Sequence, residues 1–356
     1  MADANDLKFM RRCLDLAVRA EGMTYPNPMV GAVVVCDGLI IGEGYHLRSG
    51  TPHAEVIAIE SVKDKSLLGR STLYVSLEPC SHFGKTPPCT DLIISHGIPK
   101  VVIGTIDTSE KVSGNGYDRL AAAGCEIVKG IMEEECRRLN RRFFTFHEKK
   151  RPYITLKWAQ SADGYMDVVR PQNSSVEPFW ISGKPERVLV HKWRTWEQSI
   201  LIGAGTIRSD NPGLNVRYWK GNDPIRVILT GSGALNNYLI KNKSKSPVIV
   251  FTRNAGADFR NAEKVILKKN IPSARQVIDY LFRSDIQSVF IEGGAKVLKH
   301  FIKTGLWDEA KIFSGMTRFN EGLKAPEING KLYWQEDFGT SRLKVLLNEA
   351  GNDYID

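Results

Sequence analysis

The sequence predicts an α/β protein with two domains, and three observations lead to this. Helical and strand patterns alternate along the chain, as they do where helices pack against a sheet. The chain has 356 residues, whereas single domains usually have roughly 100–200. A charged stretch that ends at Pro152 interrupts the pattern. We therefore expect a first domain over residues 1–148 and a second over 149–356.

In the first domain, apolar residues recur at helical spacing over residues 6–20, with Asn5 or Asp6 as the expected N-cap. Asp37-Gly38 separates the next two apolar runs, and this dipeptide supplies the positive φ angles that a tight hairpin turn requires. Similar patterns predict the remaining elements. Strands are expected over 30–36, 39–41, 72–77, 100–105 and 125–128, and helices from Pro52 onward and over 89–95, 117–123 and 131–146.

The second domain resumes the alternation after Pro152. Short apolar runs predict its strands, and segments with apolar residues at helical spacing predict its helices. Strands are expected over 153–158, 199–203, 225–230, 247–252, 288–291 and 310–313, helices over 184–196, 273–282 and 295–304, and an exposed loop over 241–245.

Composition and charge exclude several classes of protein. With 42% hydrophobic and 25% charged residues, the chain is neither collagen-like nor disordered. No apolar run approaches the ~18 residues of a membrane span, and six scattered cysteines suit a reducing compartment, so we expect a cytoplasmic protein. The net charge of +9 falls entirely on residues 151–356. A phosphate-rich cofactor or nucleic acid is therefore expected there, although a merely solvated basic surface would give the same charge.

The first domain contains a candidate metal site. His53, Cys80 and Cys89 offer one imidazole and two thiolates, which are ligands that Zn²⁺ prefers. Three protein ligands leave a fourth position for water, and Glu55 can move a proton from that water to a leaving amine. The order His-x-Glu and then Pro-Cys…Cys is typical of zinc deaminases. A structural zinc and two unrelated core thiols stay open as alternatives.

The long loop between the two cysteines carries a family resemblance. The run from Pro79 to Cys89, together with Pro26-Asn27-Pro28 upstream, closely resembles the deaminase domain of the bifunctional deaminase/reductases of riboflavin biosynthesis. The resemblance implies a cytidine-deaminase-like α/β/α sandwich that deaminates 2,5-diamino-6-(5-phosphoribosylamino)pyrimidin-4(3H)-one. It also implies zinc ligands, a catalytic residue and substrate contacts. These are His53, Cys80 and Cys89 for zinc, Glu55 for catalysis, and Asn27, His46, His82, Lys85, Thr86 and Asp107 for the substrate.

The resemblance continues through the second domain, where the run 156–164 is similar to the family's opening strand and turn. It implies a dihydrofolate-reductase-like α/β domain that uses NADPH to reduce the ribosyl side chain to ribityl. Segments 176–179 and 230–231 depart from the family pattern. The implied substrate contacts are Lys157, Arg194, Leu214, Arg217 and Glu292, and the implied NADPH contacts are Ala159, Trp180, Thr206, Asp210, Gly293 and Gly294.

Apart from the resemblance, Gly293-Gly294 itself indicates a phosphate-binding turn. Two glycines between a predicted strand and a predicted helix leave bare N–H groups where a pyrophosphate can bind, although tight packing alone would also favour them. The sequence lacks the G-x-G-x-x-G pattern, so a Rossmann dinucleotide fold is unsupported.

Two other functions stay open. One is a nucleic-acid-editing deaminase whose basic second domain grips phosphates, but an editing domain should itself be basic, and the charges of residues 1–150 balance to zero. The other is a chain whose reductase half has degenerated into an oligomerisation module. The resemblance instead implies a small-molecule enzyme, without nucleic acid or membrane partners, that forms a homo-oligomer through the second domain.

Overall fold

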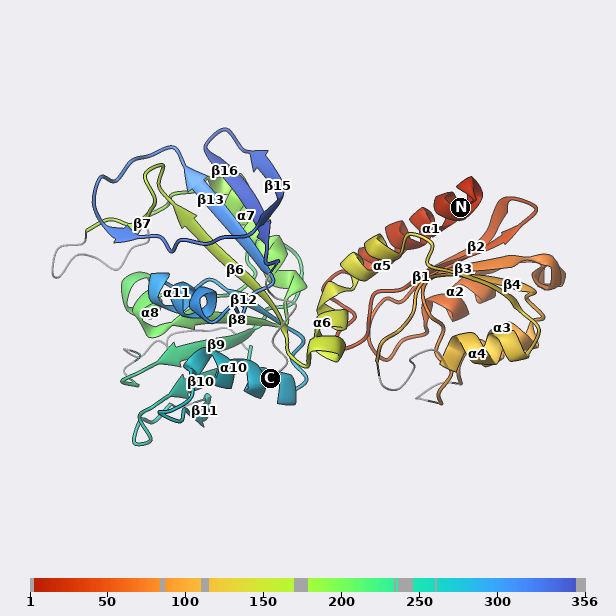
Figure 1. Ribbon diagram of the computed structural model, residues 1–356, viewed down its shortest axis with the longest axis horizontal. Helices are drawn as coiled ribbons and strands as arrows, with labels where there is room; N and C mark the ends of the chain where they lie inside the picture. The colour runs from red at the N-terminus through yellow and green to blue at the C-terminus, as the bar shows by residue number, and fades with distance from the viewer. Residues whose placement is uncertain are drawn as a thin grey trace. The chain divides into compact units, whose positions relative to one another are not determined.

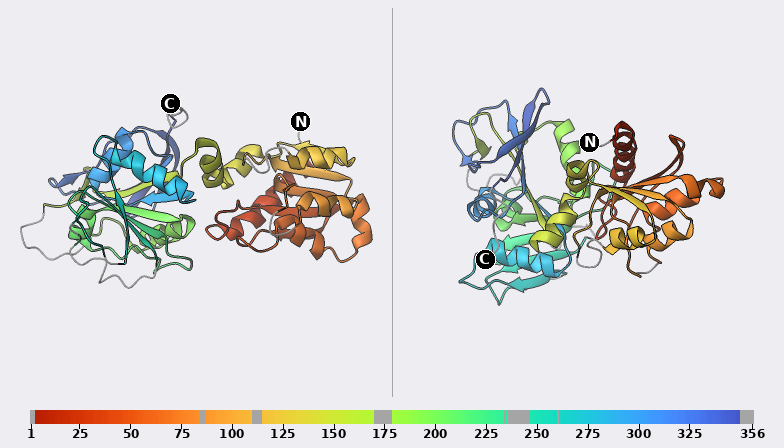
Figure 2. Two further views of the ribbon diagram at one scale, coloured as in Figure 1. Left: turned by 90° about the horizontal axis from the view of Figure 1, so that it is seen from below. Right: turned by 45° about the vertical axis from the view of Figure 1, so that its right-hand side comes forward.

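The computed structural model describes residues 3–83, 87–109, 115–169, 179–233, 235, 246–259 and 261–349. The chain divides into two compact units, Met1–Lys150 and Arg151–Asp356, and each has its own main sheet with helices on both faces (Figures 1 and 2). The division lies close to the junction expected after residue 148. Within the described part of the chain, none of the helices has the length and apolar character of a membrane span.

The first unit has a five-stranded sheet of order β2-β1-β3-β4-β5, in which β3, β4 and β5 are parallel and β1 is antiparallel to both of its neighbours. Every element expected from the sequence is present within a few residues, except for one helix discussed below. The elements are α1 (Ala4–Ala17), η1 (Val18–Ala20), β1 (Gly31–Cys36), β2 (Leu39–Tyr45), α2 (Ala54–Ser61), η2 (Lys65–Arg70), β3 (Thr72–Leu77), α3 (Cys89–Ser95), β4 (Lys100–Thr105), α4 (Asn115–Ala122), β5 (Glu126–Lys129), α5 (Glu133–Leu139) and α6 (Arg141–Lys149).

Strand β1 shows why this sheet is buried on both faces. All six of its residues are buried. Ala32 and Val34 pack into the core beneath α2, α3 and α4, whereas Val33 and Val35 pack into the core beneath α1 and α5. Successive side chains of a strand point to opposite faces, so an uninterrupted apolar run fits a strand covered on both sides.

Two local details test the sequence analysis. The hairpin turn is confirmed, because Asp37 and Gly38 both have positive φ angles, 51° and 76°, as a two-residue turn of this type requires. The expected cap of the first helix is wrong. Asp3 is the N-cap, and its side chain accepts a hydrogen bond from the Asn5 N–H. The Asp3 carboxylate therefore caps the helix in the way expected of Asn5 or Asp6, about one turn earlier.

The single helix expected over 131–146 is also wrong, because Asn140 divides it into α5 and α6. Asn140 is 3% exposed, and its amide pairs with both main-chain groups of Met29. The Met29 N–H donates to Oδ1 at 2.8 Å, and Nδ2 donates to the Met29 carbonyl at 2.8 Å. Two buried main-chain groups are satisfied by this break in the helix.

The second unit has a nine-stranded sheet of order β11-β10-β9-β8-β12-β6-β13-β16-β15, parallel except at β16 and β15. The predicted strands and helices are again present, whereas β7, α8, β11, β14, β15 and β16 were not expected. The loop predicted over 241–245 lies outside the described residues. The elements are β6 (Tyr153–Gln160), β7 (Tyr165–Asp167), α7 (Lys184–Trp196), β8 (Ser199–Gly203), α8 (Ala204–Asp210), β9 (Ile225–Thr230), β10 (Val248–Thr252), β11 (Glu263–Ile266), α10 (Ser273–Arg283), β12 (Ser288–Ile291), α11 (Ala295–Lys303), β13 (Glu309–Gly315), β14 (Leu323–Lys324), β15 (Lys331–Asp337) and β16 (Ser341–Leu347).

Two apolar cores cover the two faces of this larger sheet. One joins α10 and α11 to the sheet, and the other joins α7 and α8 to it. Strand β12 contributes to both, since Val289 and Ile291 belong to the first core and Phe290 to the second. The carboxyl ends of the parallel strands, where α/β folds place their ligands, are therefore held by packing on both sides.

Candidate active sites

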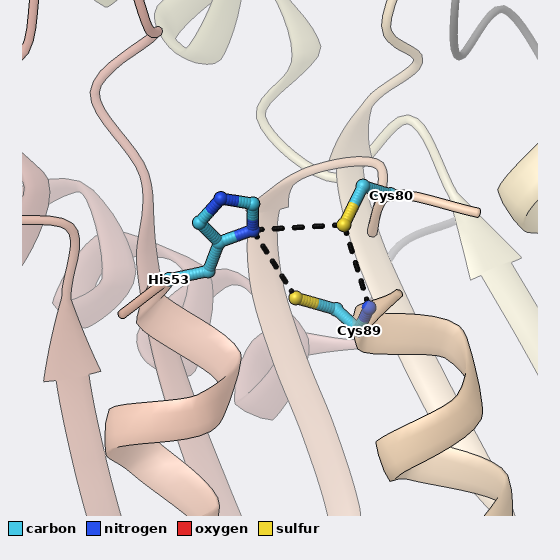
Figure 3. A group of neighbouring side chains, drawn as sticks. All are labelled: His53, Cys80 and Cys89. Carbon is cyan, nitrogen blue, oxygen red and sulfur yellow. Dashed lines mark hydrogen bonds between the residues drawn. The ribbon is translucent and has the colours of Figure 1, made fainter. Parts of the chain in front are cut away.

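In the first unit, three predicted metal ligands lie together at the carboxyl edge of the sheet (Figure 3). His53 is the N-cap of α2, Cys89 begins α3, and Cys80 follows β3. The His53 Nδ1 lies 3.6 Å from the Cys80 sulfur and 3.3 Å from the Cys89 sulfur. The Cys89 N–H also donates to the Cys80 sulfur at 3.4 Å.

These distances fit one tetrahedral zinc ion. Zinc binds sulfur at about 2.3 Å and nitrogen at about 2.0 Å, so tetrahedral angles place the two ligand atoms about 3.5 Å apart. The three ligand atoms all lie within 4.8 Å of one another. One imidazole and two sulfurs form a donor set that suits Zn²⁺ and leaves a fourth position for a water or substrate atom.

The electrostatics of the two thiols also point to a cation. Hydrogen bonds from Cys89 and His53 outweigh burial and lower the pKa of Cys80 to about 4. The hydrogen bond to Cys80, together with burial, raises the pKa of Cys89, because the two sulfurs share one proton. A divalent ion between them replaces that proton and stabilises both thiolates.

Glu55 lies in the first turn of α2 and is 3% exposed. Burial, and then the charge on Cys80, raises the pKa of Glu55 to about 7. A carboxyl group with a pKa near neutrality can both accept and donate a proton. Its position two residues after His53 places it beside the ligands without making it one of them.

Asn27 and His46 form a polar pair next to the metal ligands. The Asn27 Nδ2 lies 3.0 Å from the His46 Nε2, and the His46 Nδ1 lies 3.1 Å from the Pro52 carbonyl oxygen. The His46 ring meets the His53 ring edge-on at 5.4 Å. Burial lowers the pKa of His46, so its ring is neutral, donates to Pro52 and accepts from Asn27.

Glu78 is a residue of this site that the sequence analysis missed. It is 4% exposed, and its carboxylate accepts the N–H groups of Gly116 at 2.9 Å and Tyr117 at 3.1 Å, in α4. It also accepts the N–H of Asp107 at 3.2 Å. Gly116 is required here, since an added Cβ would lie 2.1 Å from the Pro79 carbonyl. Glu78 thus ties α4 and the Asp107 loop to the chain just before Cys80.

The remaining residues expected to bind the deaminase substrate differ in their surroundings. Asp107 is buried, which raises its pKa, and it accepts the Ser109 N–H at 2.7 Å. His82 is exposed, and it is close enough to Asp107 for its charge to oppose the rise in the pKa of that carboxyl. Lys85 and Thr86 lie outside the described residues.

In the second unit, a buried charge cluster gathers three of the residues expected to bind the reductase substrate. Arg194 of α7 donates to both carboxylate oxygens of Glu292, from Nε at 2.7 Å and from Nη2 at 3.0 Å. The Lys157 Nζ of β6 lies 4.0 Å from the same carboxylate. Burial alone would raise the pKa of Glu292, but the charges of Arg194 and Lys157 lower it to about 2. Burial also lowers the pKa of Lys157.

The other two expected substrate residues lie on the loop that follows α8. The Arg217 N–H donates to the His191 Nδ1 at 3.1 Å, and its Nη1 donates to Asn215 Oδ1 at 3.1 Å. Leu214 is 2% exposed and belongs to the apolar core. Its side chain is therefore committed to packing, and only its main chain can meet a ligand. His191, which contacts Arg217, was missed by the sequence analysis.

A cavity of about 730 Å³ opens beside the charge cluster, and Glu292 is part of its lining. Gly294 is the N-cap of α11, and its N–H donates to the Thr206 Oγ1 of α8 at 2.9 Å. The starts of two helices are therefore joined at this cavity, where their N–H groups favour a phosphate. Four residues expected to bind the cofactor line it, namely Thr206, Asp210, Gly293 and Gly294.

Comparisons with known proteins agree with this geometry. A model of the zinc-binding region of cytidine and deoxycytidylate deaminases matches residues 3–105, and a model of the RibD C-terminal domain matches residues 152–315. The riboflavin biosynthesis protein RibD of Aquifex aeolicus is 37% identical over 329 residues, which cover 91% of this chain and 90% of that protein. The chain belongs to the RibD family.

Other RibD relatives extend the match to almost the whole chain. The RibD of Synechocystis sp. is 34% identical over 360 residues, with coverage of 99% of this chain and 95% of that protein. A diaminohydroxyphosphoribosylaminopyrimidine deaminase/5-amino-6-(5-phosphoribosylamino)uracil reductase from Thermotoga maritima superposes with a TM-score of 0.85 at 39% identity. That superposition covers 97% of this chain and 99% of the other.

RibD membership establishes the function class. The chain is a bifunctional enzyme of riboflavin biosynthesis, with a zinc deaminase unit and a reductase unit that takes a nicotinamide cofactor. The fold class and the function expected from the sequence are confirmed. The comparisons support neither the nucleic-acid-editing alternative nor a degenerate second half.

Two cofactor residues carried over from the RibD resemblance are not brought to the cavity. Trp180 is 53% exposed, and the Arg187 guanidinium stacks on its ring at 4.4 Å. Ala159 lies on β6 and packs against the apolar core. Neither residue is part of the lining of the cavity. Phe179, the residue just before Trp180, does line the cavity.

Proposed function

We propose that the first unit hydrolyses 2,5-diamino-6-(5-phosphoribosylamino)pyrimidin-4(3H)-one, releasing ammonia, with zinc held by His53, Cys80 and Cys89. The observation that carries this proposal is the convergence of these three ligand atoms beside the buried Glu55. When bound, zinc supplies a water of lowered pKa and a positive charge at the reacting carbon. The Thermotoga maritima relative is named for the same substrate class.

The side chains of this unit divide the work of the first reaction. Glu55 takes a proton from the attacking water and delivers it to the departing amine, which its near-neutral pKa allows. Asn27 and the neutral His46 orient the pyrimidine next to His53. We assign Asp107 to the same substrate, and His82, Lys85 and Thr86 to its phosphate.

In the second unit, we propose that NADPH reduces the deaminated product. When bound, NADPH would supply the hydride that reduces the ribosyl C1′, the C1′–O4′ bond would break, and the ring oxygen would take a proton. We assign the substrate to Lys157, Arg194, Arg217, Glu292 and the main chain of Leu214, and the cofactor to the 730 Å³ cavity. Arg208 and Lys296 also line that cavity, and cationic side chains favour the extra phosphate of NADPH over NADH.

We keep Ala159 and Trp180 in this proposal as contacts with the nicotinamide half of the cofactor, beyond the described cavity. We also propose that the protein is located in the cytoplasm. The six cysteines are unbridged, and a site that needs two free thiolates suits a reducing compartment.

The pathway assignment is tested with the full, zinc-loaded chain and the diaminopyrimidine ribotide. Without NADPH, we expect one equivalent of ammonia per substrate and no further reaction. With NADPH, we expect one equivalent of cofactor oxidised after each deamination, and slower oxidation of NADH. If zinc-loaded protein releases no ammonia, the deaminase assignment is wrong. If it releases ammonia but never oxidises NADPH, only the reductase assignment is wrong.

The edge strand of the larger sheet supports the expected homo-oligomer. Strand β15 ends the nine-stranded order, and all seven of its residues are exposed, among them Leu332, Tyr333 and Trp334. An edge strand of this kind is a template for pairing with another chain. Antiparallel pairing of two copies about Trp334 would place Lys331 opposite Asp337 of the partner subunit. We propose that the second unit self-associates through this edge.

Replacing Trp334 with lysine should break this association, because it places a like charge from each copy at the two-fold axis. We expect light scattering to give an oligomeric mass for the wild type and the mass of one chain for Trp334→Lys. Lys344→Gln, at an exposed position of the neighbouring strand β16, is the matched control and should keep the wild-type mass. A monomeric wild type, or a Trp334→Lys variant of unchanged mass, would contradict the proposal.

A further inference from the structure

His191 lies in the reductase unit, on the face of α7 that carries Arg194 one turn later. It is 3% exposed, and its two ring nitrogens have different surroundings. Nδ1 accepts the main-chain N–H of Arg217 at 3.1 Å. Nε2 has no hydrogen-bond partner among the residues that the structure describes. The edge of the ring meets Tyr218 at 4.8 Å.

The charges around His191 fix its protonation. Burial, followed by the positive charges of Arg194 and Arg217, lowers the pKa of His191 to about 4, and the Glu292 carboxylate opposes this only in part. The ring is therefore neutral at physiological pH. Because Nδ1 is an acceptor, the proton of the neutral ring must lie on Nε2. The uncharged Nε2–H donor has no acceptor among the described residues, and it is not one of the buried side-chain atoms that lack a partner, so a bound ligand can reach it.

We propose that His191 is a further substrate-binding residue of the reductase, and that its Nε2–H donates to a hydroxyl oxygen of the substrate's sugar chain. This rests on the proposed function, in which the adjacent Arg194, Arg217, Lys157 and Glu292 bind that substrate. A neutral donor that a ligand can reach suits a neutral acceptor, and a sugar hydroxyl oxygen is one. A fourth cation at this position would be repelled by the three already present.

The same ring has a second, positioning role. Its Nδ1 accepts the main-chain N–H of Arg217, which adds one hydrogen bond to the loop that carries Arg217. The two roles belong to different ring nitrogens, and two substitutions can separate them. An asparagine amide reaches about as far as Nδ1 and can keep the bond to Arg217. A glutamine amide reaches about as far as Nε2 and can restore the donor.

The test compares His191→Asn with His191→Gln in the full chain, supplied with NADPH and the deaminated substrate. We expect His191→Asn to raise the KM for that substrate about tenfold, the effect of one lost uncharged hydrogen bond. His191→Gln should restore the KM to within about threefold of the wild type. NADPH binding, measured by quenching of tryptophan fluorescence, should not change, because no residue of α7 lines the cofactor cavity.

Controls separate this inference from the proposed function. Arg275→Gln, at an exposed position of α10, should behave as the wild type. If the wild type does not oxidise NADPH, the reductase assignment itself is wrong. If the wild type is active and His191→Asn has the same KM, or if His191→Gln is impaired as much as His191→Asn, donation from Nε2 is wrong. Should His191→Asn fail to fold, His191→Gln carries the test, and a KM raised tenfold in that variant overturns the inference.

Discussion

Glu55→Gln should abolish ammonia release while zinc stays bound. Glutamine has nearly the same shape as glutamate but cannot carry a proton from the water to the leaving amine, so we expect kcat for deamination to fall by about 10³-fold. Zinc content should remain at one ion per chain, because the ligand atoms belong to His53, Cys80 and Cys89. Ammonia release and metal analysis on the same preparation measure both quantities.

Two controls accompany this experiment. Glu60→Gln removes an exposed carboxylate from the same helix and should leave the deaminase unchanged. Glu55→Gln itself should still oxidise NADPH when it is supplied with the deaminated substrate, because the reductase site lies in the other unit. Wild-type ammonia release by a zinc-loaded Glu55→Gln variant would rule out its role as the proton carrier.

Glu292→Gln should remove reductase activity and destabilise the second unit. Glu292 neutralises Arg194 and Lys157 in a buried cluster, and removing one partner of such a cluster leaves uncompensated charge. The lowering of the Glu292 pKa from 4.5 to about 2 corresponds to about 3 kcal/mol. We expect the free energy of unfolding at neutral pH to fall by about this amount.

The pH dependence has a definite sign. The folded-state pKa of Glu292 lies below the unfolded-state value, so its stabilisation is present above about pH 4.5 and is lost as the pH falls towards about 2. The difference in stability between wild type and Glu292→Gln should therefore shrink below pH 4.5. All seven tryptophans lie in the second unit, so urea unfolding followed by tryptophan fluorescence reports on this unit alone.

Asp279→Asn is the matched control, because it breaks an exposed ion pair with Arg275 at the surface of the same unit. Exposed ion pairs contribute little to stability, so this variant should have the same free energy of unfolding as the wild type. The same stability for Glu292→Gln and the wild type at neutral pH would show that the buried cluster does not depend on this carboxylate.

The sequence predicted the metal site because each of its ligands lies at the start or end of an element that local patterns already mark. His53 precedes α2, Cys89 begins α3, and Cys80 follows β3. Parallel strands bring such ends to one edge of a sheet. Glu78 could have been found by the same reasoning, because it directly follows the buried strand β3. A buried carboxylate needs hydrogen-bond donors, and the N–H groups at the start of a nearby helix supply them.

The reductase site was harder to predict from the sequence, because its residues come from distant segments. Arg194 and Glu292 are separated by 98 residues, and nothing in either local pattern shows that the two will pair. His191 could have been suspected, since it lies three positions before Arg194 on a predicted helix and so shares its face. The neutral state of its ring could not have been predicted, because it depends on burial in the completed fold and on the charges of Arg194 and Arg217, and Arg217 comes from another loop.

By itself, the sequence determined the α/β class, the Asp37-Gly38 hairpin and the residues that could hold zinc, since these depend on backbone preferences and apolar spacing over a few residues. Only the tertiary structure decided that Asn140 breaks a helix to satisfy Met29, that Asp3 caps α1, and that Leu214 turns into the core. Each of these depends on which distant polar or apolar group is nearby, and a buried group takes whichever partner the completed fold supplies.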